Sequence, residues 1–373
     1  MKIKRHAAFV SLLAAGTLAL SACGTDQNAP QDTGQAAAPT GSADVECGGK
    51  ENLVAEGSSA QKGAMDVFSQ AYNQRCEGQR LAYTASGSGN GVKQFIGGQV
   101  DIGGSDSPLS EEKGEVAKAA ERCQGNPAWN LPMVFGPVAV AYHLEGVDSL
   151  VLTPELVAKI FNGGITNWND PAIAAVNPGT TLPDKKITVF YRGDESGTTD
   201  NFQKYLSAAA GDVWTQGDGK TFHGGVGEGK DKSAGVADAV GGVDGGITYV
   251  EWSFAQDKGL SIARLDSGAG PVELTAETAS NALKHPTIEG EGNDLRLDLD
   301  ALYASKEPNS YPLLLATYEI VCSAGYDPET AKAVKAFLTV AATDAQANLE
   351  PAGYIPVPQE FQDRLLTAIK AIS

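Results

Sequence analysis

Basic residues, histidines and metal-binding motifs are scarce in this chain. Its 373 residues include 28 lysines and arginines against 46 aspartates and glutamates, which gives a net charge of −18. This acidic balance argues against a nucleic-acid ligand and against a polybasic membrane-binding face. No CxxC pair is present, and the histidines have no metal-ligand spacing. We therefore expect neither a metal site nor another cofactor.

Sequence signatures of several enzyme classes are also missing. Neither of the two glycine-rich turns described below ends in Gly-Lys-Ser/Thr, as a P-loop does. No G-x-S-x-G sequence is present, so a hydrolase nucleophile elbow is not supported. No general base is evident, and the sequence gives no positive indication of an enzyme.

The first 22 residues have the pattern of an export signal. A basic start is followed by an apolar run, Ala7 to Leu20, which is too short for a comfortable transmembrane helix. The end of this run, Leu20-Ser21-Ala22-Cys23-Gly24, resembles a bacterial lipoprotein signal, although an ordinary signal peptide is the alternative. We expect residues 1–22 to be removed and Cys23 to carry lipid, including palmitate, on the extracytoplasmic face of the cell membrane.

A polar stretch separates this signal from the folded part of the chain. Residues 24–44 contain no large apolar side chain, so residues 23–44 are interpreted as a lipidated cysteine followed by a flexible tether. The folded part is expected to begin near Val45.

The four cysteines that follow Cys23 form an even set, which in an exported chain indicates two disulfides. Cys47 and Cys76 each precede a predicted strand. If those strands are parallel neighbours, their starts lie close together. We therefore favour Cys47–Cys76 and, by elimination, Cys123–Cys322.

Strands and helices are predicted to alternate after Val45. This alternation predicts an α/β fold with mainly parallel sheets. From apolar periodicity, the expected strands are 53–55, 81–85, 100–103, 134–144, 187–191, 247–250 and 313–322, and the expected helices are 61–73, 91–97, 154–161, 199–207, 234–240 and 328–339.

Three turns between a predicted strand and a predicted helix share one design. They are Gly57 to Ala60, Ser86 to Gly91, and Tyr191 to Thr199, and each offers glycine and a hydroxyl at the expected N-cap. A single such turn is most simply a capped helix. The third also contains Arg192, and a helix N-terminus with an adjacent arginine attracts anions. Together the three turns indicate one shared oxyanion site.

Asp106 follows another predicted strand end, where open α/β sheets bind ligands. A carboxylate only accepts hydrogen bonds, so it suits an anion that still carries a proton. Phosphate has such a proton, whereas sulfate at neutral pH has none. A turn or cap aspartate is the alternative reading.

The order of these motifs resembles the phosphate-binding proteins of bacterial phosphate ABC importers, the PstS family. The resemblance runs from about Leu53 to the C-terminus. The segments that carry it are Ser86–Gln94, Asp101–Ser110, Asn167–Pro171 with Leu182-Pro183, Arg192–Thr198 and Gly246–Glu251.

This resemblance implies two α/β lobes of the type II periplasmic-binding kind, with the ligand in the cleft between them. We expect residues 45–138 and 312–373 to form lobe I and residues 139–311 to form lobe II. By motif, it implies that Asp194 pairs with and orients Arg192. It places phosphate contacts on Ser59, Ala60, Ser88, Asp106, Arg192, Ser196, Gly197 and Thr198.

Two positions depart from the family pattern. Ser58-Ser59-Ala60 stands where the family often has Ala-Thr-Phe, and Glu195 stands where glycine is frequent. The first change keeps a hydroxyl and the backbone N–H groups, while the second bears on the geometry of the third turn.

The expected function is that of a monomeric, lipid-anchored receptor that delivers inorganic phosphate to a membrane permease. One alternative is an exported phosphatase with Ser88 or Ser196 as nucleophile. Another is a receptor for a different oxyanion. Asp106 disfavours sulfate and molybdate, and disfavours a protonated phosphonate less.

Overall fold

A computed structural model describes residues 44–284 and 287–373. The predicted signal peptide, Cys23 and all but the last residue of the predicted tether lie outside the described residues. None of the helices within the described part combines the length and the apolar character that a membrane span requires.

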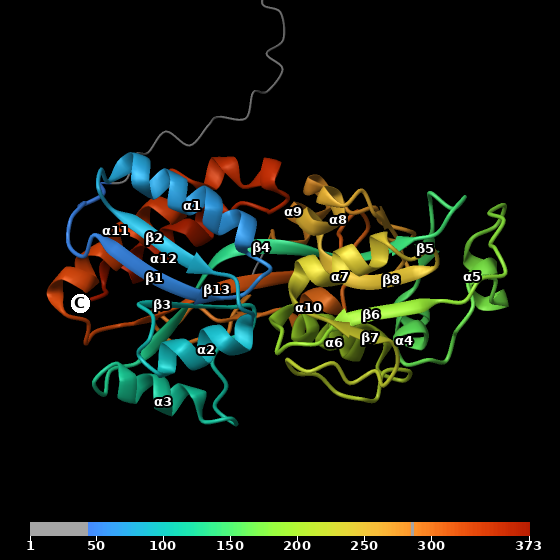
Figure 1. Cartoon of the computed structure of the whole chain (residues 1–373), viewed down its shortest axis with the longest axis horizontal. Helices are drawn as coiled ribbons and strands as arrows, with labels where there is room; N and C mark the ends of the chain where they lie inside the picture. The colour runs from blue at the N-terminus through green and yellow to red at the C-terminus, as the bar shows by residue number, and fades with distance from the viewer. Residues whose placement is uncertain (1–43, 285–286) are drawn as a thin grey trace, which may run out of the picture. The chain divides into compact units, whose positions relative to one another are not determined.

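A nine-stranded mixed sheet organises the described part of the chain (Figure 1). In spatial order its strands are β2 (Arg80–Thr84), β1 (Asn52–Gly57), β3 (Ile102–Ser105), β13 (Leu314–Cys322), β4 (Ala128–His143), β8 (Gly246–Glu251), β6 (Thr188–Arg192) and β7 (Glu228–Lys230), and β9 (Ser261–Ile262) pairs with β4. Two further sheets have two strands each, β5 (Val151–Leu152) with β10 (Arg264–Leu265), and β11 (Thr287–Ile288) with β12 (Leu297–Asp298).

The direction of the strands differs from the mainly parallel arrangement predicted above. The outer pairs, β1 with β2 and β3, and β6 with β7 and β8, are parallel. The central strands β13 and β4 run antiparallel to each other and to their other neighbours in the sheet. The α/β periodicity predicted the parallel units correctly. It also predicted the two long apolar strands that connect them, but not that these strands run antiparallel.

Strand β4 changes its partner midway along its length. Residues Ala128 to Pro137 pair with β13, and residues Val138 to His143 pair with β8. The Gly136-Pro137 pair lies at this change, inside one continuous strand. Proline lacks the N–H that a sheet interior uses. β4 thereby joins two halves of the sheet, one containing β1 to β3 and the other containing β6 to β8 (Figure 1).

Helices cover each half of the sheet. Around β1 to β3 lie α1 (Lys62–Arg75), α2 (Ser88–Ile96), α3 (Glu115–Arg122), α11 (Pro328–Ala342) and α12 (Gln359–Lys370). Around β6 to β8 lie α4 (Pro154–Phe161), α6 (Gly197–Ala210), α7 (Lys232–Gly241) and α8 (Trp252–Asp257). The chain also has α5 (Pro171–Val176), α9 (Ala276–Ala282) and α10 (Asp300–Tyr303).

Aromatic side chains fix helices to one another and to the sheet. Tyr72 of α1 meets Phe337 of α11 edge to face, with ring centroids 5.4 Å apart. Phe202 of α6 stacks on Tyr249 of β8 at 4.3 Å. All four side chains are fully buried, so each pair adds apolar burial to a favourable ring geometry.

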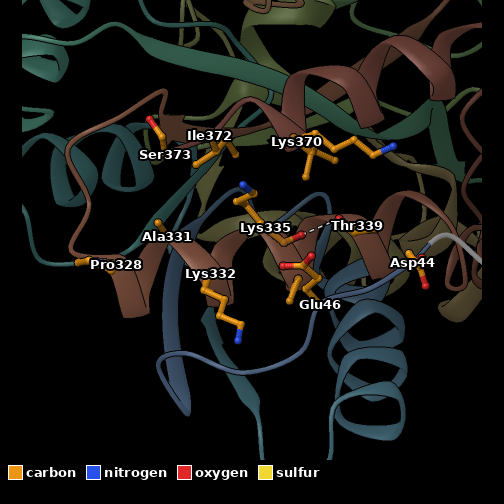
Figure 2. Close-up of a pocket in the computed structure, with 12 residues that line it drawn as sticks. Asp44, Glu46, Pro328, Ala331, Lys332, Lys335, Thr339, Lys370, Ile372 and Ser373 are labelled. Atoms are coloured by element: carbon orange, nitrogen blue, oxygen red, sulfur yellow. Dashed lines mark hydrogen bonds between the residues drawn. The ribbon is translucent and has the colours of Figure 1, made fainter.

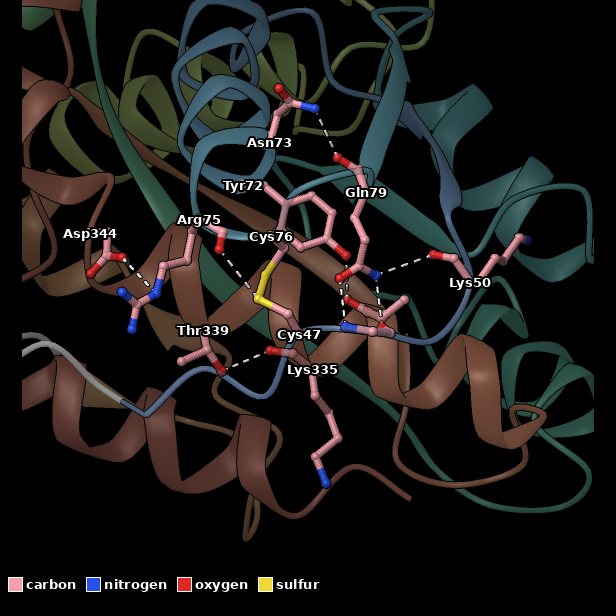
Figure 3. Close-up of a disulfide and its surroundings, with 12 residues drawn as sticks. Cys47, Lys50, Tyr72, Asn73, Arg75, Cys76, Gln79, Lys335, Thr339 and Asp344 are labelled. Carbon is pink, nitrogen blue, oxygen red and sulfur yellow. Dashed lines mark hydrogen bonds and ion pairs between the residues drawn. A yellow bond between two sulfur atoms is a disulfide. The ribbon is translucent and has the colours of Figure 1, made fainter.

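Both predicted disulfides are confirmed. Cys47–Cys76 joins the segments that lead into β1 and β2, which are parallel neighbours as the pairing argument required. Beside it, both ends of the Gln79 amide hydrogen-bond the Gly48 backbone at 2.7 Å (Figure 3). Cys123–Cys322 ties the end of α3 to the end of β13.

Candidate functional site

The three predicted turns and Asp106 meet where β1, β2, β3 and β6 end. All eight residues predicted to bind the ligand are buried. Gly197 is one of them, and the other seven are at most 3% exposed. They come from both halves of the sheet, so the site is built only when the two halves are brought together.

Arg192, the last residue of β6, is buried against Asp194. Its Nε and Nη2 atoms donate to the two carboxylate oxygens at 2.7 and 2.6 Å, a bidentate pair. Burial opposes the charge on each group, but the hydrogen bonds and mutual attraction outweigh it. The pKa of Arg192 is therefore raised and that of Asp194 is lowered. The pairing predicted for Asp194 is confirmed.

The start of α6 lies beside this pair. Ser196 is the N-cap, and its hydroxyl accepts from the Thr199 N–H, while Gly197 and Thr198 form the first turn. The first N–H groups of a helix have no acceptor within the helix and carry its positive dipole end. The Arg192 Nη1 atom lies 3.4 Å from the Thr198 hydroxyl. The Arg192 guanidinium and the first N–H groups of α6 therefore lie close together.

Asp106 approaches the same helix end from β3. Its carboxylate accepts from Ser88 Oγ at 3.0 Å and from Thr317 Oγ1 at 2.7 Å. Burial raises its pKa to about 6, against the lowering effect of these hydroxyls. A Cβ atom on Gly197 would lie 2.5 Å from Asp106 Cβ and 2.7 Å from Ser88 Oγ. Only glycine permits this close approach.

The first turn reaches the second half through serines. Ser59 Oγ lies 2.9 Å from Ser233 Oγ, and Ser233 Oγ accepts from Arg192 Nη1 at 3.2 Å. The N–H of Ala60 donates to Ser58 Oγ at 3.0 Å. A ligand contact through Ala60 would have to share or replace that bond.

The expectation of a hydroxyl N-cap in every turn is wrong in two of the three. The N-cap is Gln61 in the first turn and Gly87 in the second, and neither makes a side-chain cap bond. Gly87 has φ 99°, a conformation that favours glycine, and α2 begins at Ser88, three residues earlier than predicted. The Ser88 hydroxyl is thus free of capping and reaches Asp106 instead.

Several residues of the site escaped the sequence analysis. Ser233 lies near the start of α7 in a fourth strand-to-helix turn, so the same hydroxyl pattern could have found it. Thr317 sits in the middle of β13, and no local signal marks it. Glu251 ends the quoted Gly246–Glu251 segment and is 1% exposed. Its Oε1 atom accepts from the Thr198 hydroxyl.

A further buried acid, Glu319 of β13, lies opposite Gly104 of β3 and interacts with the charge of Asp106. Neither of its carboxylate oxygens has a hydrogen-bond partner among the described residues. Burial raises its pKa to about 8. At neutral pH this side chain is therefore mostly protonated and adds little negative charge near Asp106.

A separate groove of about 540 Å³ lies along α11 and the end of the chain (Figure 2). Lys332, Lys335 and Lys370 border it together with Asp44 and Glu46. None of its lining residues belongs to the predicted site. Positive and negative side chains both line this groove, so it lacks the cluster of donors that surrounds Arg192.

Comparison with known sequences supports a phosphate-binding protein, as the geometry does. The family described as the PBP superfamily domain matches residues 27–345. "Phosphate-binding protein PstS 3" of Mycobacterium tuberculosis is 52% identical over 378 residues, with 100% of both chains covered. The protein of the same description from Mycobacterium leprae is 49% identical over 375 residues, again covering 100% of both.

Solved structures share the two-lobed α/β fold. A periplasmic phosphate-binding protein (PfluDING) bound with phosphate superimposes with a TM-score of 0.70 at 22% identity, covering 85% of this chain and 93% of its own. A human phosphate binding apolipoprotein has a TM-score of 0.67 at 20% identity, covering 84% and 93%. Proteins of distant sequence therefore have the same mixed α/β fold as this chain.

Proposed function

Because this chain belongs to the PstS family of phosphate-binding proteins, we propose that it captures inorganic phosphate and delivers it to the permease of an ABC importer. The ligand would lie where Arg192, the start of α6, the serine turns and Asp106 meet. The observation that carries the proposal is this convergence of buried donors around the carboxylate of Asp106.

The donors are suited to a tetrahedral oxyanion. Arg192 contributes a fixed cation, since its pair with Asp194 holds the guanidinium in place. Gly197 and Thr198 contribute helix N–H groups, and Ser59 contributes a hydroxyl. The Ser88 hydroxyl, which donates to Asp106 in this structure, would turn to the ligand to act as a donor. The chain is strongly acidic overall, so attraction must come from these short contacts rather than from its overall charge.

Asp106 would supply the specificity. An ionised carboxylate accepts the O–H of HPO₄²⁻ or H₂PO₄⁻, but it would repel a fully ionised anion and remain without a donor. Ser88 and Thr317 occupy it with hydroxyl donors and hold it beside Gly197.

We take residues 45–138 and 312–373 as lobe I and residues 139–311 as lobe II. The change of β4 from β13 to β8 between Pro137 and Val138 supports this boundary. Phosphate binding would close the lobes about the crossing strands.

The remaining parts of the proposal concern the setting of the protein. Cys23 would anchor a monomeric receptor to the extracytoplasmic face of the cell membrane after residues 1–22 are removed. The receptor would carry its ligand without chemical conversion, in keeping with relatives that are described as phosphate-binding proteins.

Calorimetry on protein freed of bound phosphate tests the function. We expect tight phosphate binding and much weaker sulfate binding. Equal affinity for both anions would contradict the role of Asp106, and absence of phosphate binding would contradict the function. Mass measurement under native conditions, before and after ligand removal, would show whether the purified receptor retains phosphate.

A further inference from the structure

Asn201, in the second turn of α6, is a buried amide whose side chain makes three hydrogen bonds beside the site. It is 3% exposed. Its Nδ2 atom donates to the Asp106 carbonyl at 2.7 Å and to the Gly197 carbonyl at 2.8 Å, and its Oδ1 atom accepts from the Tyr303 hydroxyl at 2.6 Å. Both partners of Nδ2 are carbonyl oxygens, which only accept, so this orientation of the amide is the one that satisfies all three groups.

One of these three bonds crosses the proposed lobe boundary. Gly197 and Tyr303 belong, like Asn201, to proposed lobe II, whereas Asp106 belongs to proposed lobe I. The two bonds inside lobe II hold the amide in a fixed orientation. Its remaining N–H is thereby presented to the main chain of Asp106.

The neighbouring residues repeat this crossing. Asp200 Oδ2 accepts from Ser107 Oγ at 2.6 Å, and both side chains belong to residues that are 5% exposed. Two consecutive residues of α6 therefore hold two consecutive residues of the turn that follows β3. A single hydrogen bond would let this turn pivot, whereas two adjacent bonds restrict its rotation as well as its position.

The position of this turn matters because it carries the acidic group of the site. Asp106 lies so close to the start of α6 that a Cβ atom on Gly197 would be 2.5 Å from Asp106 Cβ. A hydrogen bond from an O–H to a carboxylate needs a separation of about 2.5–2.7 Å. The carboxylate can therefore test an anion for a proton only if its distance from the donors of α6 is held constant.

We propose that Asn201 is a positioning residue for anion discrimination. Its amide holds the main chain of Asp106 against the start of α6, at the spacing from which the carboxylate accepts the proton of phosphate. The inference rests on the proposed function. Because the bond joins the two proposed lobes, it also resists their opening and lengthens the time for which phosphate stays bound.

A cavity of about 300 Å³ borders the amide, and Asp106, Asn201 and Tyr303 are among its lining residues. Asn201→Ala would enlarge this existing space, so we expect the variant to fold. Water that enters can donate to the Asp106 carbonyl in place of the amide. Such a water is not attached to α6, so it satisfies the carbonyl without positioning the residue.

The first experiment compares phosphate and sulfate binding in Asn201→Ala and in the unmodified protein, by calorimetry and by competition between the anions. We expect phosphate affinity to fall about 10- to 100-fold, as for the loss of one buried hydrogen-bond partner. Sulfate has no proton to give Asp106, so its affinity should fall less and the phosphate-to-sulfate ratio should decrease. Stopped-flow measurement should show faster phosphate release.

Asn177→Ala is the matched control. Asn177 is 6% exposed, and its Nδ2 atom donates to the carbonyls of Val151 and Ile173, both at 2.9 Å. Its Oδ1 atom accepts the Val151 N–H at 2.8 Å. The same three-bond pattern thus lies wholly inside proposed lobe II. This variant should lose stability but keep the anion ratio and the release rate. An equal fall of the ratio in Asn177→Ala would overturn the inference.

A double-mutant cycle tests whether Asn201 acts through Asp106. In an Asp106→Asn background the carboxylate that Asn201 positions is gone, so Asn201→Ala should change the anion ratio by no more than about twofold. An undiminished fall of the ratio in that background would overturn the inference, because Asn201 would then act independently of the carboxylate.

Tyr303→Phe decides the matter if Asn201→Ala does not fold. It removes the hydroxyl that orients the Asn201 amide and keeps the buried ring. We expect the same changes at a smaller size, about 2- to 10-fold. An unchanged ratio and release rate would overturn the inference and leave the receptor function intact. Absence of phosphate binding by the unmodified protein would instead count against the receptor function itself.

Discussion

On the β6 side of the site a buried cation has its counterion two residues away, whereas on the β3 side a buried carboxyl group has only hydroxyl donors. Asp194 holds two of the Arg192 guanidinium nitrogens, its pKa is lowered, and Nη1 remains directed to the site. Asp106 rests on Ser88 and Thr317, and burial raises its pKa to about 6. The β6 side is thus arranged to attract an anion under most conditions, while the β3 side responds to protons.

The largest expected effect comes from removing the cation. Arg192→Ala should weaken phosphate binding by about 2–5 kcal/mol, because it removes a buried charge partner and leaves Asp194 unpaired. Arg192→Lys keeps the charge without the planar fork, so its loss should be smaller. Calorimetry on both variants measures this order. Equal losses would show that the fork geometry is unimportant.

Asp106→Asn tests the other side. An asparagine can donate to an anion that has no proton, so sulfate binding should improve relative to phosphate by about 10- to 100-fold, or 1–3 kcal/mol. Competition between the two anions measures the ratio. An unchanged ratio would assign the discrimination to other groups of the site.

Glu319→Gln sharpens the comparison through stability. Unfolded glutamate releases its proton near pH 4.3, whereas Glu319 in the folded protein holds its proton up to about pH 8. Between these values the folded state binds more protons, so burial of this acid costs stability that grows as pH rises and then levels off.

The variant should therefore be more stable than the unmodified, phosphate-free protein, by a gain that increases from about pH 4 to about pH 8. The gain should reach a few kcal/mol, at about 1.4 kcal/mol per pKa unit. Denaturant unfolding at several pH values measures it, with Glu77→Gln as an exposed control. A gain that does not depend on pH would contradict the assignment.

The smallest effect is expected at the rim of the site. Lys93 Nζ of α2 lies 2.6 Å from Glu195 Oε2, and the Gly89 N–H donates to the Glu195 carbonyl at 3.0 Å. The charged pair is about half exposed. Breaking it by Lys93→Ala or Glu195→Gln should cost less than about 1 kcal/mol and speed phosphate release slightly. A double-mutant cycle at low and high salt isolates the pair, and a salt-independent coupling would contradict a solvent-exposed ion pair.

Glu195 also shows how a departure from the family pattern is accommodated. Glycine is frequent at this position, and the substitution raised the possibility of an altered turn. The Arg192–Asp194 pair and the start of α6 are nonetheless formed, because the Glu195 side chain points away toward Lys93. Gly89 leaves room for it, since a Cβ there would lie 2.4 Å from Glu195 Cβ.

Local physics determined a large part of this protein. Apolar periodicity predicted α4 at its observed bounds and most other long helices to within a few residues. The helix start at Ser196 followed from the local turn pattern, and Cys47–Cys76 followed from the pairing of adjacent parallel strands. Cys123–Cys322 followed by elimination, and the Arg192–Asp194 pair was implied by the family resemblance. The helix bounds and the start at Ser196 depend on groups close in sequence, which is why a local pattern could predict them.

Only the tertiary structure decided which distant residues contact Asp106 and the start of α6. Thr317 reaches Asp106 across 211 residues, and Glu251 reaches Thr198 across 53. The antiparallel course of β4 and β13 was equally hidden, because a long apolar strand has the same local pattern whichever neighbours it takes. Hydrogen bonds between residues far apart depend on how strands are ordered in the sheet, and that order is fixed by burial of the whole core rather than by any one segment.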